Sequence, residues 1–394
     1  MREVVICAAR RTPIGKFLGG LSSLTPADLG AAIVPPVLED AGLAATSVDE
    51  LLFGCGRQAG SGPNVARQVA IRSGLPTSST AVTLNMACGS GLLSIIEARN
   101  SIARGESDVA VAGGTESMSR LPFYLEEART GYRLGHGQLV DGMYRDGFHC
   151  PMADQLMGAT AENLADEFEI SRDEQDAYAV ESQRRCEVAR SEGRFRAEIA
   201  PVEVKGRKGA VVVEEDEHPR DGVTIESTGK LKPVFRDGGT VHPGNSSGIT
   251  DGATALVLAS EGVARDLELP ILARVGASAK AGVEPRRMGM GPVPAVRKLL
   301  ERTGRSLGDY DLVELNEAFA AQVIACDREL GFDRERLNVN GGSIALGHPI
   351  GATGARIVVT LLHELRRRGG GLGLATLCIS GGQGLALEIV VGDA

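Results

Sequence analysis

A weak internal repeat restricts the fold of this chain more than any other feature of its sequence. Three segments near the start find echoes, in the same order, near the end. The pairs are 49–54 (DELLFG) with 311–316 (DLVELN), 84–90 (LNMACGS) with 337–343 (LNVNGGS), and 109–114 (VAVAGG) with 374–382 (LATLCISGG). Together the pairs predict two similar α/β halves. The seam between such halves is a natural place for a binding site.

Strand and helix patterns alternate in the first part of the chain, and a strand pattern returns after residue 248. In chain order these patterns lie at 4–9 (strand), 25–38 (helix), 48–55 (strand), 64–73 (helix), 108–112 (strand) and 253–259 (strand). Such alternation favours a parallel α/β layer.

The segment from 120 to 248 has a different character, because it is more polar and irregular. It contains one clear helical pattern, which begins at a capping box of Ser171 and Glu174 and stops at Gly193. We interpret this segment as an insertion that covers one face of the α/β layer. The expected domains are therefore 1–119 plus 249–270 (N-terminal half), 120–248 (loop domain) and 271–394 (C-terminal half).

Cys88 occupies a position that suits a reactive thiol. The sequence around it predicts a strand with alternating apolar residues that ends near Met86, then a small-residue turn, then an apolar helix that continues to Arg104. Unpaired N–H groups and the helix dipole at such a helix start favour an anion, and they can lower a thiol pKa to roughly 3.5–7.5. The alternative is that Cys88 is a buried small hydrophobe.

Composition excludes several classes of protein. The formal charge of −9 argues against nucleic acid as a partner. The 7 cysteines are widely spaced without a C-x-x-C pair, so neither a disulfide framework nor a zinc site is expected. No apolar stretch reaches the roughly 18 residues of a membrane span, and no signal peptide is recognisable. We therefore expect a cytoplasmic protein without bound metal or membrane partner.

Three further motifs could assist a thiol nucleophile. His348 lies in a glycine-rich loop, Cys378 precedes a glycine turn, and Asn316 follows an apolar run. A thiol nucleophile needs a base, for which His348 is suited. Chemistry beside a carbonyl needs a second proton-transfer group, for which Cys378 is suited. It also needs hydrogen-bond donors to the oxyanion, and Asn316 is suited to be one of them. Alternatively, His348 could cap a loop, Cys378 could fill the core and Asn316 could hold a turn.

The combination of Asn316-Glu317-Ala318-Phe319, Gly347-His348-Pro349 and Cys378 closely resembles the thiolases, in their acetyl-CoA acetyltransferase branch. The resemblance extends over essentially the whole chain. It implies a five-layered α-β-α-β-α fold with two similar halves and an inserted loop domain. It also implies condensation of two acetyl-CoA to acetoacetyl-CoA and CoA, and the reverse thiolytic cleavage of 3-ketoacyl-CoA. No cofactor is implied, because coenzyme A is substrate and product, and relatives are homodimers or homotetramers.

The resemblance also implies roles for single residues. Cys88 would take the acyl group, His348 would remove its proton, and Cys378 would exchange a proton with the methyl carbon of the second acetyl-CoA. Asn316, through a water, and His348 would form one oxyanion hole, and the N–H groups of Cys88 and Ser380 the other. The implied contacts of coenzyme A are Arg220, Ser227, Ser247, Met288 and Phe319, with Leu156 and Met157 beside the pantetheine.

Two departures from the family concern the acyl chain. Leu156 replaces a histidine that many close relatives have, and Ser380 replaces a frequent glycine.

Two alternative functions also remain. A ketosynthase-like condensing enzyme uses a second histidine where this chain has Cys378. A non-catalytic acyl-CoA or lipid binding protein on the same fold would not need these polar groups.

Overall fold

The N-terminal half of the chain builds a five-stranded mixed sheet. The computed structural model describes residues 2–206 and 209–392. The strands lie in the order β4-β3-β5-β12-β1, and their bounds are β1 Val4–Arg11, β3 Glu50–Gly54, β4 Thr80–Leu84, β5 Val109–Ser117 and β12 Thr250–Ser260. β3 is parallel to β4 and β5, whereas β12 is antiparallel to β5 and β1. The short β2 (Gly15–Lys16) pairs with β12.

The C-terminal half repeats this arrangement. Its strands lie in the order β14-β15-β16-β13, and their bounds are β13 Ala273–Gly282, β14 Leu312–Leu315, β15 Gly371–Ile379 and β16 Gln383–Val391. β14 is parallel to β15, and β16 is antiparallel to both of its neighbours. A parallel bridge between Val313 and Leu337 stands where β4 pairs with β3 in the first half. The topology thus confirms the predicted repeat, and a short β1–β13 pairing links the two sheets.

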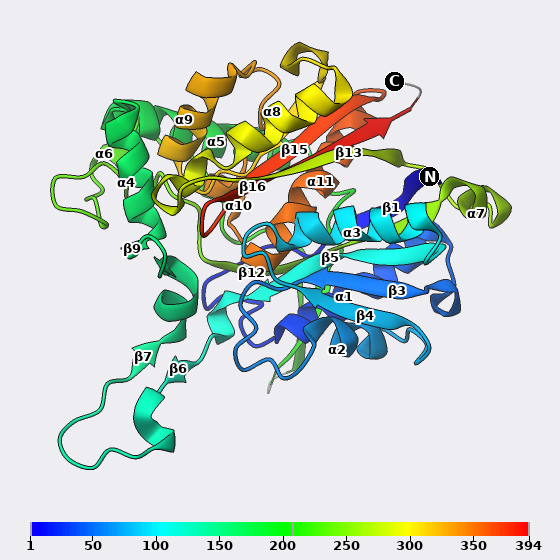
Figure 1. Cartoon of the computed structure of the whole chain (residues 1–394), viewed down its shortest axis with the longest axis horizontal. Coiled ribbons are helices and arrows are strands. Elements are labelled where there is room, and N and C mark those ends of the chain that lie inside the picture. Colours follow the sequence, from blue (N-terminus) through cyan, green and yellow to red (C-terminus); the bar gives the residue numbers. More distant parts are fainter. Residues whose placement is uncertain (1, 207–208, 393–394) are drawn as a thin grey trace.

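Helices separate and cover the two sheets. α3 (Ser90–Arg104) and α11 (Ile350–Arg367) lie between the sheets, as Figure 1 shows. α1 (Pro26–Ala41) and α2 (Val65–Arg72) cover the outer face of the first sheet, and α8 (Pro292–Thr303) and α9 (Ala320–Leu330) belong to the outer layer of the second. Each helical layer has its own buried apolar cluster. These are the five layers that the resemblance implied.

The two central helices touch through their backbones, because glycines occupy the contact. A Cβ on Gly91 of α3 would lie 2.8 Å from the backbone nitrogen of Ala355, and one on Gly354 of α11 would lie 2.4 Å from that of Leu92. Only glycine permits so close an approach. α3 begins two residues after Cys88, and α11 begins two residues after His348. The contact therefore fixes the relative position of the chain segments that carry these two side chains.

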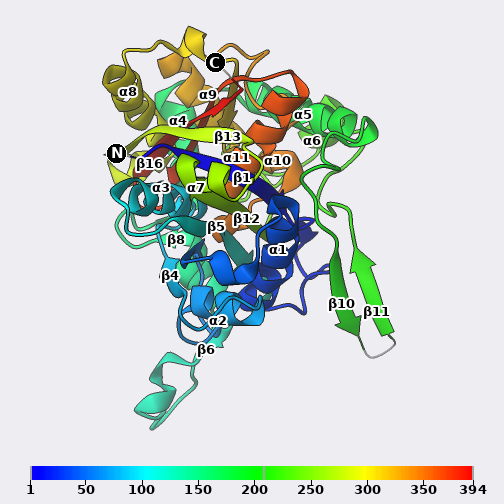
Figure 2. The same cartoon turned by 90° about the vertical axis from the view of Figure 1, so that its right-hand side faces the viewer.

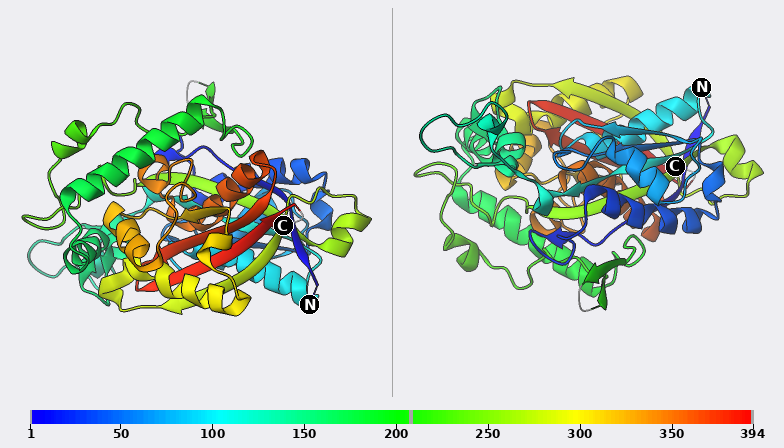
Figure 3. Two further views of the ribbon diagram at one scale, coloured as in Figure 1. Left: turned by 90° about the horizontal axis from the view of Figure 1, so that it is seen from above. Right: turned by 90° about the horizontal axis from the view of Figure 1, so that it is seen from below.

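The segment from 120 to 248 contains more structure than the sequence indicated. The capping box at Ser171 is confirmed, and it starts α5 (Arg172–Ser191), the long green helix along one side of the molecule in Figure 3. The segment also holds α4 (Met157–Glu167) and the short α6 (Ile225–Gly229), so the expectation of one clear helix was wrong. α4 has no side-chain cap at its start, which removes the strongest local signal for a helix.

Two parts of this segment project from the body. Residues 121–148, with β6 (Phe123–Tyr124) and β7 (Val140–Asp141), extend downward in Figures 1 and 2. The hairpin of β10 (Val202–Gly206) and β11 (Gly209–Val213) projects on another side in Figure 2. β8 (His149–Cys150) pairs with β9 (Gln155–Leu156) near the body. The remaining short α-helices of the described residues are α7 (Glu261–Asp266) and α10 (Ser343–Leu346).

The alternating apolar residues before Cys88 form a strand, but not a buried one. β4 is an edge strand, and Val82 is 47% exposed. The expected domain division at 119/120, 248/249 and 270/271 stays a prediction. Among residues 2–206 and 209–392, no helix is both long and apolar enough to cross a membrane.

Candidate active site

A cavity of about 540 Å³ brings together most of the residues singled out from the sequence. Both halves and the loop segment contribute to its wall. Its predicted residues are Cys88, Leu156, Met157, Arg220, Ser247, Met288, Phe319, His348, Cys378 and Ser380. Two predicted residues are not part of this wall. Asn316 is buried outside it, and Ser227 is exposed on the first turn of α6.

A tight turn presents Cys88 to the cavity. Ala87 has a φ of +44°, which places it in the left-handed region that non-glycine residues rarely adopt. The Ser90 hydroxyl fixes this turn, because its oxygen accepts from the Met86 N–H (2.9 Å) and its proton goes to the Ala87 carbonyl (2.7 Å). A Cβ on Gly89 would lie 2.5 Å from Cδ1 of Ile379, so a larger residue there would displace this side chain. The turn therefore holds the thiol in one place ahead of α3.

The environment of Cys88 raises the pKa of its thiol, contrary to the prediction of a lowered one. Burial is the largest cause, and it outweighs the opposing effects of the Arg57 guanidinium and of the N–H groups of Ser380 and Cys88 itself. The start of a helix is thus insufficient here to produce a resting thiolate. Cys88 must lose its proton to a base as it reacts.

His348 can act as that base, because its ring is neutral and carries its single proton on Nδ1. Its Nδ1 lies 2.7 Å from the Thr353 hydroxyl oxygen, and this hydroxyl donates to the Pro349 carbonyl (3.0 Å). Since Thr353 has one proton to give, it accepts from an Nδ1–H, which leaves Nε2 with a free lone pair. Nε2 has no partner within the part of the chain that the structure describes. Burial, together with the Arg356 and Arg57 cations, lowers the pKa of His348 to about 3, so the ring is neutral at physiological pH.

Cys378 is a second neutral thiol on the same cavity. It lies near the end of β15, is fully buried, and packs with Met288, Ala318 and Phe319. Burial raises the pKa of its thiol well above the ordinary value, and a negative charge on Cys88 raises it further. Such a group holds its proton until a stronger base or a leaving thiolate takes it.

Asn316 lies directly after β14 and is fixed by two hydrogen bonds. Its N–H donates to the Thr376 carbonyl (3.0 Å), and its Oδ1 accepts from the Ser343 hydroxyl (2.6 Å). Its Nδ2 is buried and has no partner among the described residues. A buried amide nitrogen without a partner is unusual, and it suits a bound water or substrate oxygen.

Three basic side chains that sequence reasoning missed also line the cavity: Lys16, Arg57 and His218. Arg57 donates from Nη2 to the Gly147 carbonyl at 2.9 Å. Burial lowers the pKa of His218, whose Nδ1 lies 2.7 Å from the Ala345 carbonyl. The only sequence signal was that His218 stands two positions before Arg220. The fold, not a local motif, brings these residues to one place.

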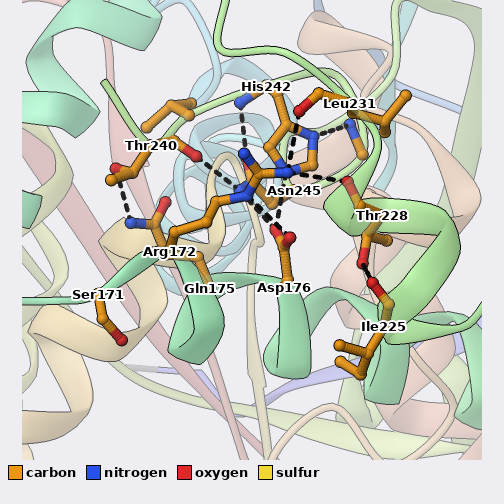
Figure 4. A network of polar contacts seen from close by, with 12 residues as sticks. Ser171, Arg172, Gln175, Asp176, Ile225, Thr228, Leu231, Thr240, His242 and Asn245 are labelled. Carbon is orange, nitrogen blue, oxygen red and sulfur yellow. Dashed lines mark hydrogen bonds and ion pairs between the residues drawn. The ribbon is translucent and has the colours of Figure 1, made fainter. Parts of the chain in front are cut away.

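A buried polar network fixes the two loops beside the cavity (Figure 4). Asp176 of α5 accepts from His242 Nε2 (2.7 Å) and from Asn245 Nδ2 (3.1 Å), which holds the loop that leads to Ser247. Arg172, one turn earlier on α5, donates to the carbonyls of Thr228 (2.8 Å) and Leu231 (3.0 Å), next to Ser227. α5 thus anchors both candidate coenzyme A loops.

Comparisons with known proteins agree with this geometry. The thiolase N-terminal domain matches residues 4–262, and the thiolase C-terminal domain matches residues 269–391. The chain is 52% identical over 390 residues to an acetyl-CoA acetyltransferase of Pseudomonas aeruginosa, and 50% identical over 390 residues to one of Escherichia coli, with 99% of each chain covered in both cases.

Two solved structures have the same fold. The Bacillus anthracis acetyl-CoA acetyltransferase superimposes with a TM-score of 0.98 at 45% identity, covering 100% of this chain and 99% of the other. Human mitochondrial 3-ketoacyl-CoA thiolase in complex with CoA gives a TM-score of 0.95 at 41% identity, covering 99% of this chain and 98% of the other. Both domain matches and these full-length similarities lead to one conclusion: the chain belongs to the thiolase family.

Proposed function

We propose that this thiolase catalyses the condensation of two acetyl-CoA to acetoacetyl-CoA and CoA, and the reverse thiolytic cleavage of 3-ketoacyl-CoA. The observation that carries the proposal is the meeting of two neutral thiols, Cys88 and Cys378, with the neutral base His348 on one cavity. A binding protein would need none of the three. A ketosynthase-like enzyme would need a histidine in place of Cys378.

The first half-reaction transfers an acetyl group to Cys88. His348 Nε2 takes the thiol proton while the sulfur attacks the thioester carbon of acetyl-CoA. The N–H groups of Cys88 and Ser380 would then donate to the oxygen of the acyl group on Cys88. Coenzyme A leaves as a thiolate and then takes the proton of Cys378. The enzyme is left with acetyl-Cys88, an imidazolium at His348 and a thiolate at Cys378.

The second half-reaction uses those two charged groups. The Cys378 thiolate removes a proton from the methyl carbon of the second acetyl-CoA, and the resulting carbanion attacks acetyl-Cys88. Asn316, through a water, and the His348 imidazolium would donate to the thioester oxygen of this second acetyl-CoA. Cys88 leaves as a thiolate and recovers its proton from His348. Every group has then returned to its starting state.

The loop domain, 120–248, would hold most of coenzyme A. Arg220 and Lys16 on the cavity wall offer positive charge to phosphate groups, whereas Leu156, Met157 and Met288 offer apolar surface to the pantetheine. Ser247 and Phe319 would line the thioester end. Ser227 lies outside the cavity wall, on an exposed turn, which suits contact with the nucleotide end.

We further propose a homo-oligomer joined through the projecting part of the loop domain. Its exposed apolar side chains include Phe123, Leu125, Leu134, Leu139 and Tyr144, and Leu134 is fully exposed. Single exposed apolar residues are common, but several on one projection indicate an interface.

The two remaining domains, 1–119 plus 249–270 and 271–394, would form the catalytic body. The 7 unpaired cysteines fit a reducing, cytoplasmic location.

One experiment tests the proposed chemistry. Purified protein is mixed with acetoacetyl-CoA and CoA, and the formation of acetyl-CoA is measured. In parallel, the protein is incubated with acetyl-CoA and the masses of its peptides are measured by mass spectrometry, with Cys88→Ala as the control. Turnover together with an acetyl mass on the Cys88 peptide is expected. Binding without turnover, or acetylation confined to another cysteine, would refute the proposal.

A further inference from the structure

Ser343 is a fully buried side chain that the proposed mechanism does not use. It starts α10, and its hydroxyl oxygen lies 3.0 Å from Arg356 Nη2 and 2.6 Å from Asn316 Oδ1. It therefore stands between a buried cation and the amide that the mechanism assigns to an oxyanion hole.

The direction of these two hydrogen bonds follows from the chemistry of the groups. A guanidinium can only donate, so the Ser343 oxygen accepts from Arg356. The single hydroxyl proton of Ser343 is then free for Asn316, and it needs an acceptor there. Only the carbonyl oxygen of the amide can accept. The arrangement thus distinguishes the two ends of the Asn316 side chain: Oδ1 faces Ser343, and the NH₂ group is turned away from it.

The strand geometry explains why this donor is in reach. Glu314 lies in β14 and Asn316 follows the strand directly, two residues further on, so their side chains share the face that looks toward α11. Arg356 of α11 lies 3.5 Å from Glu314 through Nη1, and the two side chains are 1% and 4% exposed. The Glu314 carboxyl thus holds the guanidinium beside Ser343. Burial raises the pKa of this carboxyl to about 8, although Arg356 opposes the rise.

The internal repeat places an equivalent serine in each half. Ser343 corresponds to Ser90 in the repeated segments 84–90 and 337–343. The Ser90 hydroxyl fixes the turn that presents Cys88. In the second half the equivalent hydroxyl donates instead to the side-chain amide of Asn316, directly after β14.

We propose that Ser343, held by Arg356 and Glu314, is a positioning residue that fixes the amide of Asn316 with its NH₂ group toward the water of the proposed oxyanion hole. The unpartnered, buried Nδ2 of Asn316 is the group that this orientation makes available. The inference rests on the proposed role of Asn316 as an oxyanion donor. Without the Ser343 proton, the amide can turn over and present its carbonyl oxygen to that water, which then loses the N–H donor that holds it.

The test is a double-mutant cycle in thiolysis of acetoacetyl-CoA, with kcat and KM for CoA measured separately. We expect Asn316→Ala to lower kcat by about 10²–10³-fold, the loss typical of an oxyanion donor. Ser343→Ala should lower kcat by roughly tenfold and leave KM within about twofold, because it misdirects a donor without touching CoA. In the Asn316→Ala background, Ser343→Ala should cost less than about twofold more, since the residue through which it acts is gone.

The matched control is Ser101→Ala, which removes a buried serine hydroxyl far along α3 from Cys88 and should leave kcat within about twofold. If Ser343→Ala does not fold, Ser343→Thr keeps the hydroxyl and should retain kcat within about threefold.

An equal loss from Ser343→Ala in both backgrounds would overturn the inference, because Ser343 would then act independently of Asn316. A wild-type kcat for Ser343→Ala beside a large loss for Asn316→Ala would also overturn it, as would a folded Ser343→Thr with a tenfold loss. If Asn316→Ala itself retains full activity, the role proposed for Asn316 fails instead.

Discussion

Replacing Thr353 by valine removes the hydroxyl that selects the reactive form of His348 and nearly keeps the side-chain volume. In the native protein the Nδ1–H of His348 donates to Thr353, which leaves Nε2 free to take the Cys88 proton. Valine leaves that N–H buried and unpaired, a penalty of about 1–3 kcal/mol. The ring can escape the penalty by moving its proton to Nε2, where it blocks the base. By the conversion of 1.4 kcal/mol per factor of ten, we expect acylation of Cys88 to slow roughly 5- to 150-fold.

The assay measures the rate of single-turnover acetylation of Cys88. The reaction is quenched at intervals, and the acetylated peptide is quantified by mass spectrometry. Thr360→Val on the same helix is the matched control, because Thr360 is also buried and its hydroxyl makes a longer contact, 3.4 Å, with Glu198. That variant should acylate within about twofold of wild type. The melting temperatures of both variants are compared so that a folding defect is not read as a chemical one. A Thr353→Val protein that is folded and acylates at the wild-type rate would refute the tautomer argument.

Three further predictions concern the same cavity. Because the pKa of His348 is lowered to about 3, the base stays deprotonated from pH 8 down to 5, and the acylation rate should not fall over that range for want of a base; a drop with a midpoint near the ordinary histidine pKa of about 6.5 would contradict this. Cys378→Ala should leave Cys88 open to acetylation, because coenzyme A can depart as a thiolate, while condensation and thiolysis collapse; unchanged turnover in the acetoacetyl-CoA assay would make Cys378 merely structural. Leu156→His should lower kcat/KM for 3-ketohexanoyl-CoA more than for acetoacetyl-CoA, since an apolar wall favours each buried CH₂ by roughly 0.8 kcal/mol; equal losses measured on one preparation would remove Leu156 from the choice of chain length.

Local patterns predicted the elements well because their causes are local. The strand at 48–55, the helix after Cys88 and the capping box at Ser171 all depend on neighbours within a few positions, and the structure contains each of them. The repeat was also recognisable, because equivalent turns in the two halves use similar residues. α4 was missed because its first turn has no capping side chain.

The chemistry of the site was harder to predict, because distant segments determine it. The thiol pKa of Cys88 was expected to fall, and it rises because burial outweighs the nearby donors. Cys88 packs against an apolar cluster that includes Met118 and Ile350, which come from separate parts of the chain. The orientation of Asn316 depends on Ser343 and Arg356, and sequence spacing alone does not reveal such contacts.

The glycine contact between α3 and α11 also affects how this enzyme can change over evolutionary time. Because Gly91 and Gly354 let two main chains meet, no side-chain packing sets the spacing between the helices at that point. Substitutions elsewhere in the core can accumulate while the segments bearing the nucleophile and its base keep their relative position. Part of the cavity wall comes from the loop segment, including Leu156 and Phe148, and lies outside this contact. Substrate range can therefore diversify through the loops, while the reaction itself is inherited unchanged.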